Sequence, residues 1–130
     1  MMIFKKVYAI TPNPALDLNG DTKKITPNEK NYILRESRFP GGNAINNARI
    51  LSRLNCPVSV SGFLGGATGD QLENLLDAEK MHTDFVRIAK DTRINVTISN
   101  RSTHKQNRFS FPGPPIQTLE KKLLIKWERH

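Results

Sequence analysis

The chain has 130 residues, a formal net charge of +8 at pH 7, 37% hydrophobic residues and one cysteine. This length suits one domain with a core of its own. A lone Cys56 excludes an internal disulfide, and no apolar run reaches the ~20 residues that a membrane-spanning helix needs. The positive charge favours an anionic partner, but the basic residues are scattered and form no stripe interleaved with aromatic residues. We therefore expect a phosphate-bearing small molecule as the partner, and neither nucleic acid nor a membrane.

The N-terminal residues Met1 to Lys6 are followed by no apolar signal core and no small-residue cleavage site. A cytoplasmic location is the corresponding expectation. Cys56 is followed by Pro57 and has no histidine near it in sequence, so we expect it to be packed at the end of a helix without a catalytic role.

The first half of the chain alternates between short apolar runs and amphipathic segments. We predict a buried strand over 7–10, strands over 32–35 and 58–64, and helices over 44–54 and after Thr68 or Asp70, either of which could cap the second helix. The stretch from Asp17 to Asn31 is polar and rich in turn residues, which indicates that it is not a core element. The strand–helix–strand–helix order predicts a parallel sheet covered by helices.

The second half of the chain has a different pattern, in which apolar and polar residues alternate. A short strand is predicted over 85–88, and two strictly alternating runs, 93–99 and 107–111, enclose a polar turn over 102–105. Alternation on both sides of a turn is typical of a hairpin with one solvated face. We expect a small antiparallel cover beside the parallel body, followed by a helix over 118–129.

A paired-glycine turn precedes the first predicted helix. Gly41 and Gly42 carry no Cβ, so a ligand can approach the main chain closely, and the helix start offers free N–H groups. Asn43, Asn46 and Asn47 add neutral hydrogen-bonding groups that suit hydroxyls. The alternative is a helix capped by a Gly-Gly turn.

The predicted hairpin collects cationic and amide side chains. Arg93 and Asn95 are two apart, so they share a face, and Arg108 is on the adjoining strand. Two guanidinium groups brought together there would need an anion such as phosphate between them. The alternative is a solvated polar face. Asp17 follows the first strand, where α/β sheets bind ligands, and can accept hydrogen bonds from sugar hydroxyls, although a simple turn aspartate is equally consistent.

Other candidate motifs are weaker. The segment 65–70, Gly-Gly-Ala-Thr-Gly-Asp, lacks the Lys-Ser/Thr ending of a Walker loop and the GxGxxG spacing, so we interpret it as a strand-to-helix turn near the ligand. His82, His104 and His130 are too dispersed for a metal cluster, and no serine–histidine arrangement predicts a triad. The sequence therefore predicts neither a metal ligand nor a catalytic residue in this chain.

Taken in order, several short segments resemble the ribokinase-like (PfkB) carbohydrate kinase family, in the branch of the phosphofructokinases, 1-phosphofructokinases and tagatose-6-phosphate kinases. The resemblance covers nearly all of the chain up to about Ile116. It is carried by Thr11-Pro12-Asn13-Pro14-Ala15-Leu16-Asp17, Pro40-Gly41-Gly42, Ile45-Asn46, Gly65-Gly66-Ala67-Thr68-Gly69, Asp91-Thr92-Arg93-Ile94-Asn95-Val96, Asn107-Arg108-Phe109 and Pro112-Gly113-Pro114. It implies a ribokinase-like α/β fold, with a parallel sheet, flanking helices and a small antiparallel β lid.

The resemblance also implies an activity and a binding site. The family phosphorylates a sugar or sugar phosphate, here of the fructose 6-phosphate or fructose 1-phosphate type, with ATP and Mg²⁺. By position, Asp17 would bind sugar hydroxyls, Arg93 would hold the phosphate of the substrate, and Lys30 and Arg108 would add phosphate contacts from the lid. The remaining implied substrate-binding residues are Gly41, Gly42, Asn46 and Asn95. Lids of two subunits pack against each other in this branch, which implies a homodimer.

Two departures from the family pattern limit the expectation. Asn43-Ala44 stands where many relatives have Lys-Gly or Gly-Gly, which leaves the choice of sugar phosphate open. The chain also has no Asn-x-x-Glu motif and no Gly-Ala-Gly-Asp anion hole, so it would end before the nucleotide-binding half. We expect residues 1–130 to form the substrate-binding part, with lid segments at about 16–38 and 91–111.

This part of the chain is expected to lack kinase activity and to bind neither ATP nor Mg²⁺ tightly. An alternative is a catalytically inactive module that binds sugar phosphate or dimerises, and a basic nucleic-acid binder is a third, weaker possibility.

Overall fold

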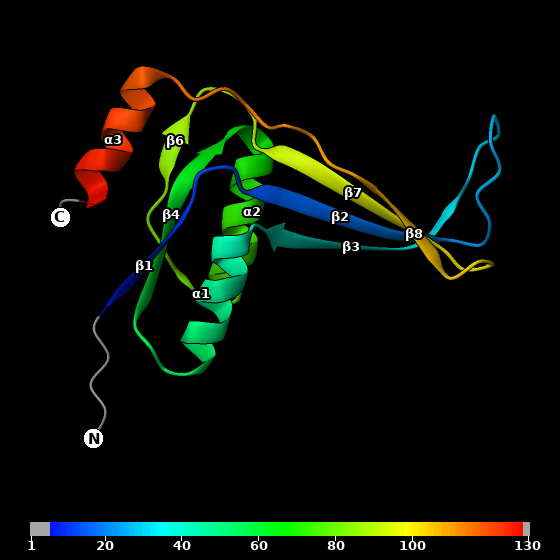
Figure 1. Cartoon of the computed structure of the whole chain (residues 1–130), viewed down its shortest axis with the longest axis horizontal. Coiled ribbons are helices and arrows are strands. Elements are labelled where there is room, and N and C mark those ends of the chain that lie inside the picture. Colours follow the sequence, from blue (N-terminus) through cyan, green and yellow to red (C-terminus); the bar gives the residue numbers. More distant parts are fainter. Residues whose placement is uncertain (1–5, 129–130) are drawn as a thin grey trace.

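A computed structural model describes residues 6–128 as a parallel α/β body from which a second sheet projects (Figure 1). The body sheet contains β1 (Val7–Thr11), β4 (Val58–Gly65), β5 (His82–Thr83) and β6 (Val86–Ile88). β4 is central, since it pairs in parallel with each of the other three strands. The parallel sheet predicted from the strand–helix alternation is present. Most of the N-terminal segment used to predict the location lies outside the described residues.

Helices α1 (Asn43–Arg53) and α2 (Gly66–Ala78) pack on the body sheet and enclose the core. Ile45 and Ala48 of α1 and Leu72 and Leu76 of α2 are fully buried. They contact Val58, Val60 and Leu64 of β4, whose eight residues are all buried. An all-apolar strand face between two helices is typical of a parallel sheet, and its burial provides most of the stabilisation of the body.

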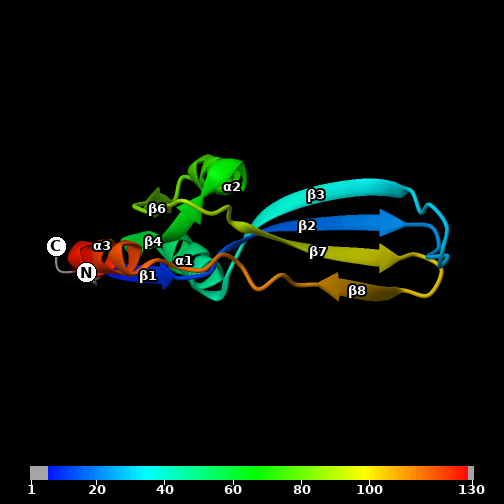
Figure 2. The same cartoon turned by 90° about the horizontal axis from the view of Figure 1, so that it is seen from above.

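The second sheet is the lid, which we define as the four strands β2 (Ala15–Thr22), β3 (Ile33–Gly41), β7 (Arg93–Asn100) and β8 (Lys105–Phe109). Their order is β3-β2-β7-β8, with β2 and β7 parallel to each other and the two outer strands antiparallel to their neighbours. The lid extends away from the body, and the loops 23–32 and 101–104 lie at its far end (Figures 1 and 2).

The register gives the lid two chemically different faces. Asp17 pairs with Asn95, and Thr97 pairs with Arg108, so these four side chains share one polar face. Leu18 pairs with Val96, and Val96 with Phe109, so the opposite face carries an apolar patch, and we call it the apolar face. Glu36 and Arg38 of β3 lie on the same face at its edge. The hairpin predicted from the alternating runs is present as β7 and β8, shifted by two residues in β8.

Three predictions of local structure were wrong, and one short strand was missed. The polar stretch after Asp17 contributes to β2, because alternate residues of this strand line the polar face of the lid while Leu16 and Leu18 point to the other. β1 is only partly buried, with Tyr8 49% exposed, because it lies at the edge of the body sheet. α2 begins at Gly66 without a side-chain cap from Thr68 or Asp70. The two-residue strand β5 was missed, as it is too short to show alternation.

The final helix α3 (Thr118–Glu128) lies beside β6. Glu120 accepts hydrogen bonds from the main-chain N–H of Gln117 at 2.8 Å and from that of Ala89 at 3.1 Å, so it both caps the helix and joins it to the body. Arg129, the last residue of the predicted helix, lies outside the described range. Among residues 6–128 no helix has the length and apolar character to cross a membrane. Cys56 is buried just after α1, as predicted.

Candidate functional site

A pocket of about 460 Å³ opens where the lid joins the body. Five of the residues predicted to bind substrate line it: Asp17, Gly42, Asn46, Arg93 and Asn95. They come from β2, the start of α1, α1 itself and β7, so segments that are far apart in sequence meet here. The loop after β1, which includes Asn13, completes the wall. The position matches the expectation that α/β proteins bind ligands beyond the carboxyl ends of their parallel strands.

Asp17 is the one carboxylate among the residues that line this pocket. Burial raises the pKa of Asp17 above its ordinary value of 3.8, while a hydrogen bond from Asn95 and the positive charge of Arg93 oppose this rise. The carboxylate is therefore partly desolvated, with a hydrogen-bond donor and a cation beside it. Such a group is a strong hydrogen-bond acceptor for a hydroxyl.

Gly41 and Gly42 make room for this arrangement in different ways. A Cβ on Gly41 would lie on top of the Asp17 carboxylate, so a glycine at 41 is what allows the carboxylate its position. Gly42 has φ 137°, a conformation that L side chains rarely adopt, and precedes α1 as its N-cap residue. No side chain caps this helix start. The first-turn N–H groups of α1 thus border the pocket without a side-chain partner.

Arg93 joins three of the four segments that cross between body and lid. Its Nη1 donates to the carbonyl of Phe111 at 2.8 Å, and its Nη2 donates to the carbonyl of Asn13 at 3.0 Å. The side chain of Asn13 in turn donates to the carbonyl of Pro112 at 2.9 Å, and Asn95 accepts from the Phe111 N–H at 3.1 Å. The Nε of Arg93 is buried and has no hydrogen-bond partner among the described residues. Arg93 therefore has two roles. It holds two main-chain segments together by hydrogen bonds, and it places a positive charge at the pocket wall.

Arg108 is not brought next to Arg93, contrary to the expectation of two neighbouring guanidinium groups. It pairs with Thr97, four residues along β7 from Arg93, which is about 13 Å of strand. Arg108 instead lines an adjoining pocket of about 380 Å³ on the polar lid face, and this pocket shares Asp17 and Asn95 with the first. Lys30 lies in the loop 23–32 at the far end of the lid (Figure 1).

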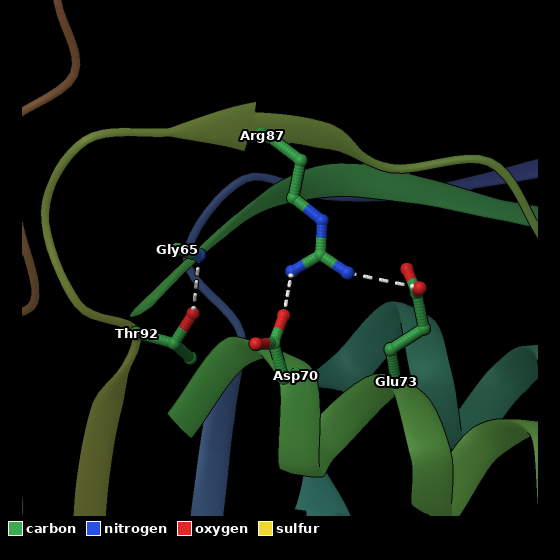
Figure 3. A network of polar contacts seen from close by, with 5 residues as sticks. All are labelled: Gly65, Asp70, Glu73, Arg87 and Thr92. Carbon is green, nitrogen blue, oxygen red and sulfur yellow. Dashed lines mark hydrogen bonds and ion pairs between the residues drawn. The ribbon is translucent and has the colours of Figure 1, made fainter. Parts of the chain in front are cut away.

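The glycine segment between β4 and α2 is hydrogen-bonded to Thr92, the residue before β7. The Gly65 N–H donates to Oγ1 of Thr92 at 3.0 Å, and Oγ1 of Thr68 donates to the Thr92 carbonyl at 2.7 Å. Figure 3 shows the Gly65–Thr92 contact beside the ion pairs of Arg87 with Asp70 and Glu73, each 2.9 Å. We call the contacts of Gly65 and Thr68 with Thr92 the latch, because they join the body to the lid. The segment predicted as a turn near the ligand thus makes its hydrogen bonds within the protein.

Sequence reasoning missed the supporting residues of the site. Asn13 and the main chain of Phe111 are hydrogen-bonded to Arg93 and Asn95. The only sequence signal for this support was the position of Asn13 between Pro12 and Pro14, which predicts a rigid turn. Within residues 6–128 no group of three or more His, Cys, Asp or Glu side chains could hold a metal ion.

Fold and site together define an α/β protein with a polar pocket between its body and a β lid. The model of the pfkB family of carbohydrate kinases matches residues 7–129, and the chain belongs to this family. It is 33% identical to the 1-phosphofructokinase of Borreliella burgdorferi over 118 residues, which are 91% of this chain and 38% of that protein. It is 34% identical to the D-tagatose-1-phosphate kinase of Bacillus licheniformis, covering 92% of this chain and 38% of that protein.

The solved structures agree with the sequences. Phosphofructokinase-2 from Escherichia coli, in a crystal structure with fructose-6-phosphate, superposes with a TM-score of 0.87 at 30% identity, covering 94% of this chain and 40% of that one. The fold is therefore ribokinase-like, as the sequence resemblance implied. The chain spans about two fifths of the length of these relatives, so it is a truncated form of the fold.

Proposed function

We propose that this chain is the sugar-phosphate-binding part of a phosphofructokinase-type kinase. The observation that carries the proposal is the half-buried Asp17 carboxylate, which lines a polar pocket. It accepts a hydrogen bond from Asn95 and lies directly against Gly41. The 1-phosphofructokinase and tagatose-1-phosphate kinase relatives support a phosphorylated ketose as the ligand.

The described contacts suggest which residues would bind the hydroxyl groups of the ligand and which would bind its phosphate. The Asp17 carboxylate would accept hydrogen bonds from sugar hydroxyls, and Asn46 with the uncapped start of α1 would supply donors. Arg93, which lines the pocket, would attract the phosphate through its charge. Arg108, in the adjoining pocket, and Lys30, in the lid loop, would add cationic contacts, with Lys30 reaching a site other than the pocket of its own chain.

For the whole protein we propose transfer of a phosphoryl group from ATP to a sugar hydroxyl, with Mg²⁺ to neutralise the phosphate charges. The described residues present no metal-binding cluster, so they do not fit a Mg²⁺ site of their own. The part of the reaction that this chain can perform is to bind and orient the acceptor. We place the complete protein in the cytoplasm.

Calorimetric titration of the purified chain with fructose 1-phosphate tests the proposal. We expect saturable binding that is absent with fructose, lost in Asp17→Asn and unchanged in Asp77→Asn, an exposed α2 residue outside both pockets. We also expect no ATP-dependent turnover of the sugar phosphate. No binding by the wild-type chain, or equal binding by Asp17→Asn, would contradict the proposal.

A second candidate is a binding or assembly module without catalysis, which the apolar face of the lid favours. Leu18, Val96 and Phe109 line this face, and Phe109 is 57% exposed. We propose that this face joins two copies of the chain into a homodimer.

A further inference from the structure

Asn46 is one of the residues that line the pocket, and its side-chain amide has two chemically different ends. The oxygen Oδ1 only accepts hydrogen bonds, and the NH₂ group only donates them. Asn46 is otherwise an exposed helix residue, whose side chain would be free to rotate and to offer either end to a ligand. What contacts the amide therefore determines what kind of ligand atom it can bind.

Arg49, three residues further along α1, makes that contact. Its Nη1 donates to Oδ1 of Asn46 at 3.0 Å. Because a guanidinium has donors and no acceptor, it can only be paired with the oxygen of the amide. The NH₂ group of Asn46 is then the end that remains for a ligand in the pocket.

The guanidinium group of Arg49 is itself bound by a residue at the end of α2. Its Nε and Nη2 donate to the two carboxylate oxygens of Glu79, at 2.7 and 3.0 Å. Glu79 is the C-cap residue of α2, so the carboxylate is placed by the end of that helix. The Arg49 side chain is only 22% exposed. A bidentate pair of this kind restricts the guanidinium to one plane and one orientation.

We propose that Arg49 and Glu79 are positioning residues for the ligand pocket. They hold the Asn46 amide with its NH₂ group available as a hydrogen-bond donor, and so favour a ligand oxygen with a free lone pair at that place. The proposal rests on the proposed function for the identity of the ligand. The alternative is that the pair only joins α1 to α2, in which case the Asn46 amide would not depend on it.

Side-chain ¹⁵N relaxation of Asn46 tests the positioning without any ligand. In the wild-type chain we expect an order parameter near that of rigid backbone, about 0.85, and in Arg49→Met a fall below about 0.6. Arg49→Lys keeps the charge but loses the planar fork, so an intermediate value is expected. The matched control is Arg53→Met, on the same helix and exposed, which should leave Asn46 unchanged. An Asn46 amide equally ordered in wild type and Arg49→Met, or already mobile in wild type, would overturn the proposal.

Titration with fructose 1-phosphate adds a functional arm. We expect Arg49→Met to weaken binding about fivefold to tenfold, the effect of one neutral hydrogen bond, while Arg53→Met binds as wild type. In an Asn46→Ala background the same Arg49 change should have no further effect. Additive losses would show that Arg49 acts by another route and would overturn the proposal. If the wild-type chain does not bind the sugar phosphate, the proposed function fails, and the relaxation experiment still decides the role of Arg49.

Discussion

At the scale of single residues, the burial of Asp17, the proposed sugar-binding carboxylate, counts against stability. Its pKa is raised by burial, so between 3.8 and that raised value the folded chain binds a proton that the unfolded chain does not. Stability from this group is greatest below 3.8 and declines as pH rises through the folded pKa. At pH values above the folded pKa the carboxylate is ionised in both states, and its desolvation counts against the fold.

We therefore expect Asp17→Asn to be slightly more stable than wild type at pH 7, while it loses sugar binding. Solvent screening at this half-exposed site limits the gain to below about 1 kcal/mol. Urea unfolding at a series of pH values measures it, and the difference between the two chains should shrink as pH falls toward 3.8. A variant that is clearly less stable than wild type at pH 7 would show that Asp17 stabilises the fold.

Two glycines allow binding and folding to be separated. A Cβ on Gly41 would overlap the Asp17 carboxylate, which can turn away to solvent, so Gly41→Ala should lose sugar binding with little loss of stability. A Cβ on Gly62 would instead overlap the main-chain carbonyl of Thr11, where φ is 150°, so Gly62→Ala should unfold the body. Calorimetry and urea unfolding on both variants check this contrast. Equal destabilisation by both would contradict it.

At the scale of elements, the latch around Thr92 joins the lid to the body. Thr92 is 4% exposed and its Oγ1 accepts the Gly65 N–H, so Thr92→Val leaves a buried donor without a partner. We expect a loss of about 1–3 kcal/mol in the free energy of unfolding. Thr103→Val, in the exposed turn of the lid, is the control and should change stability by less than about 0.5 kcal/mol. A loss in Thr92→Val no larger than in the control would mean that the latch contributes nothing.

The elements also show where sequence reasoning succeeded and where it stopped. The α1 and β4 segments were predictable because their apolar periodicity is set by a core that their own side chains form. β2 was missed as a strand because its polar residues face a pocket, and the pattern of such a strand depends on strands that are distant in sequence. The convergence of Asp17, Asn46 and Arg93 was implied by the family resemblance, but the hydrogen bonds of Arg93 to main-chain carbonyls leave no trace in a sequence.

At the scale of the whole molecule, the unequal faces of the lid indicate two different uses. The polar face borders both pockets, while the apolar face carries Leu18, Val96 and Ile98 without a helix packed over the outer part of the lid (Figures 1 and 2). A contiguous apolar surface rimmed by polar residues is typical of a protein–protein interface. Because the two faces alternate along each strand, a single strand offers neighbouring positions that test one face against the other.

Ile98 and Ser99 of β7 provide that comparison. If two copies of the chain join through the apolar face, Ile98→Lys should place a charge in the interface and yield a monomer, because burying an unpaired ammonium is strongly unfavourable. Ser99→Lys places the same charge on the polar face and should leave the dimer intact. Sedimentation velocity at micromolar concentration separates the two states. A wild-type monomer, or an Ile98→Lys dimer, would contradict association through the apolar face.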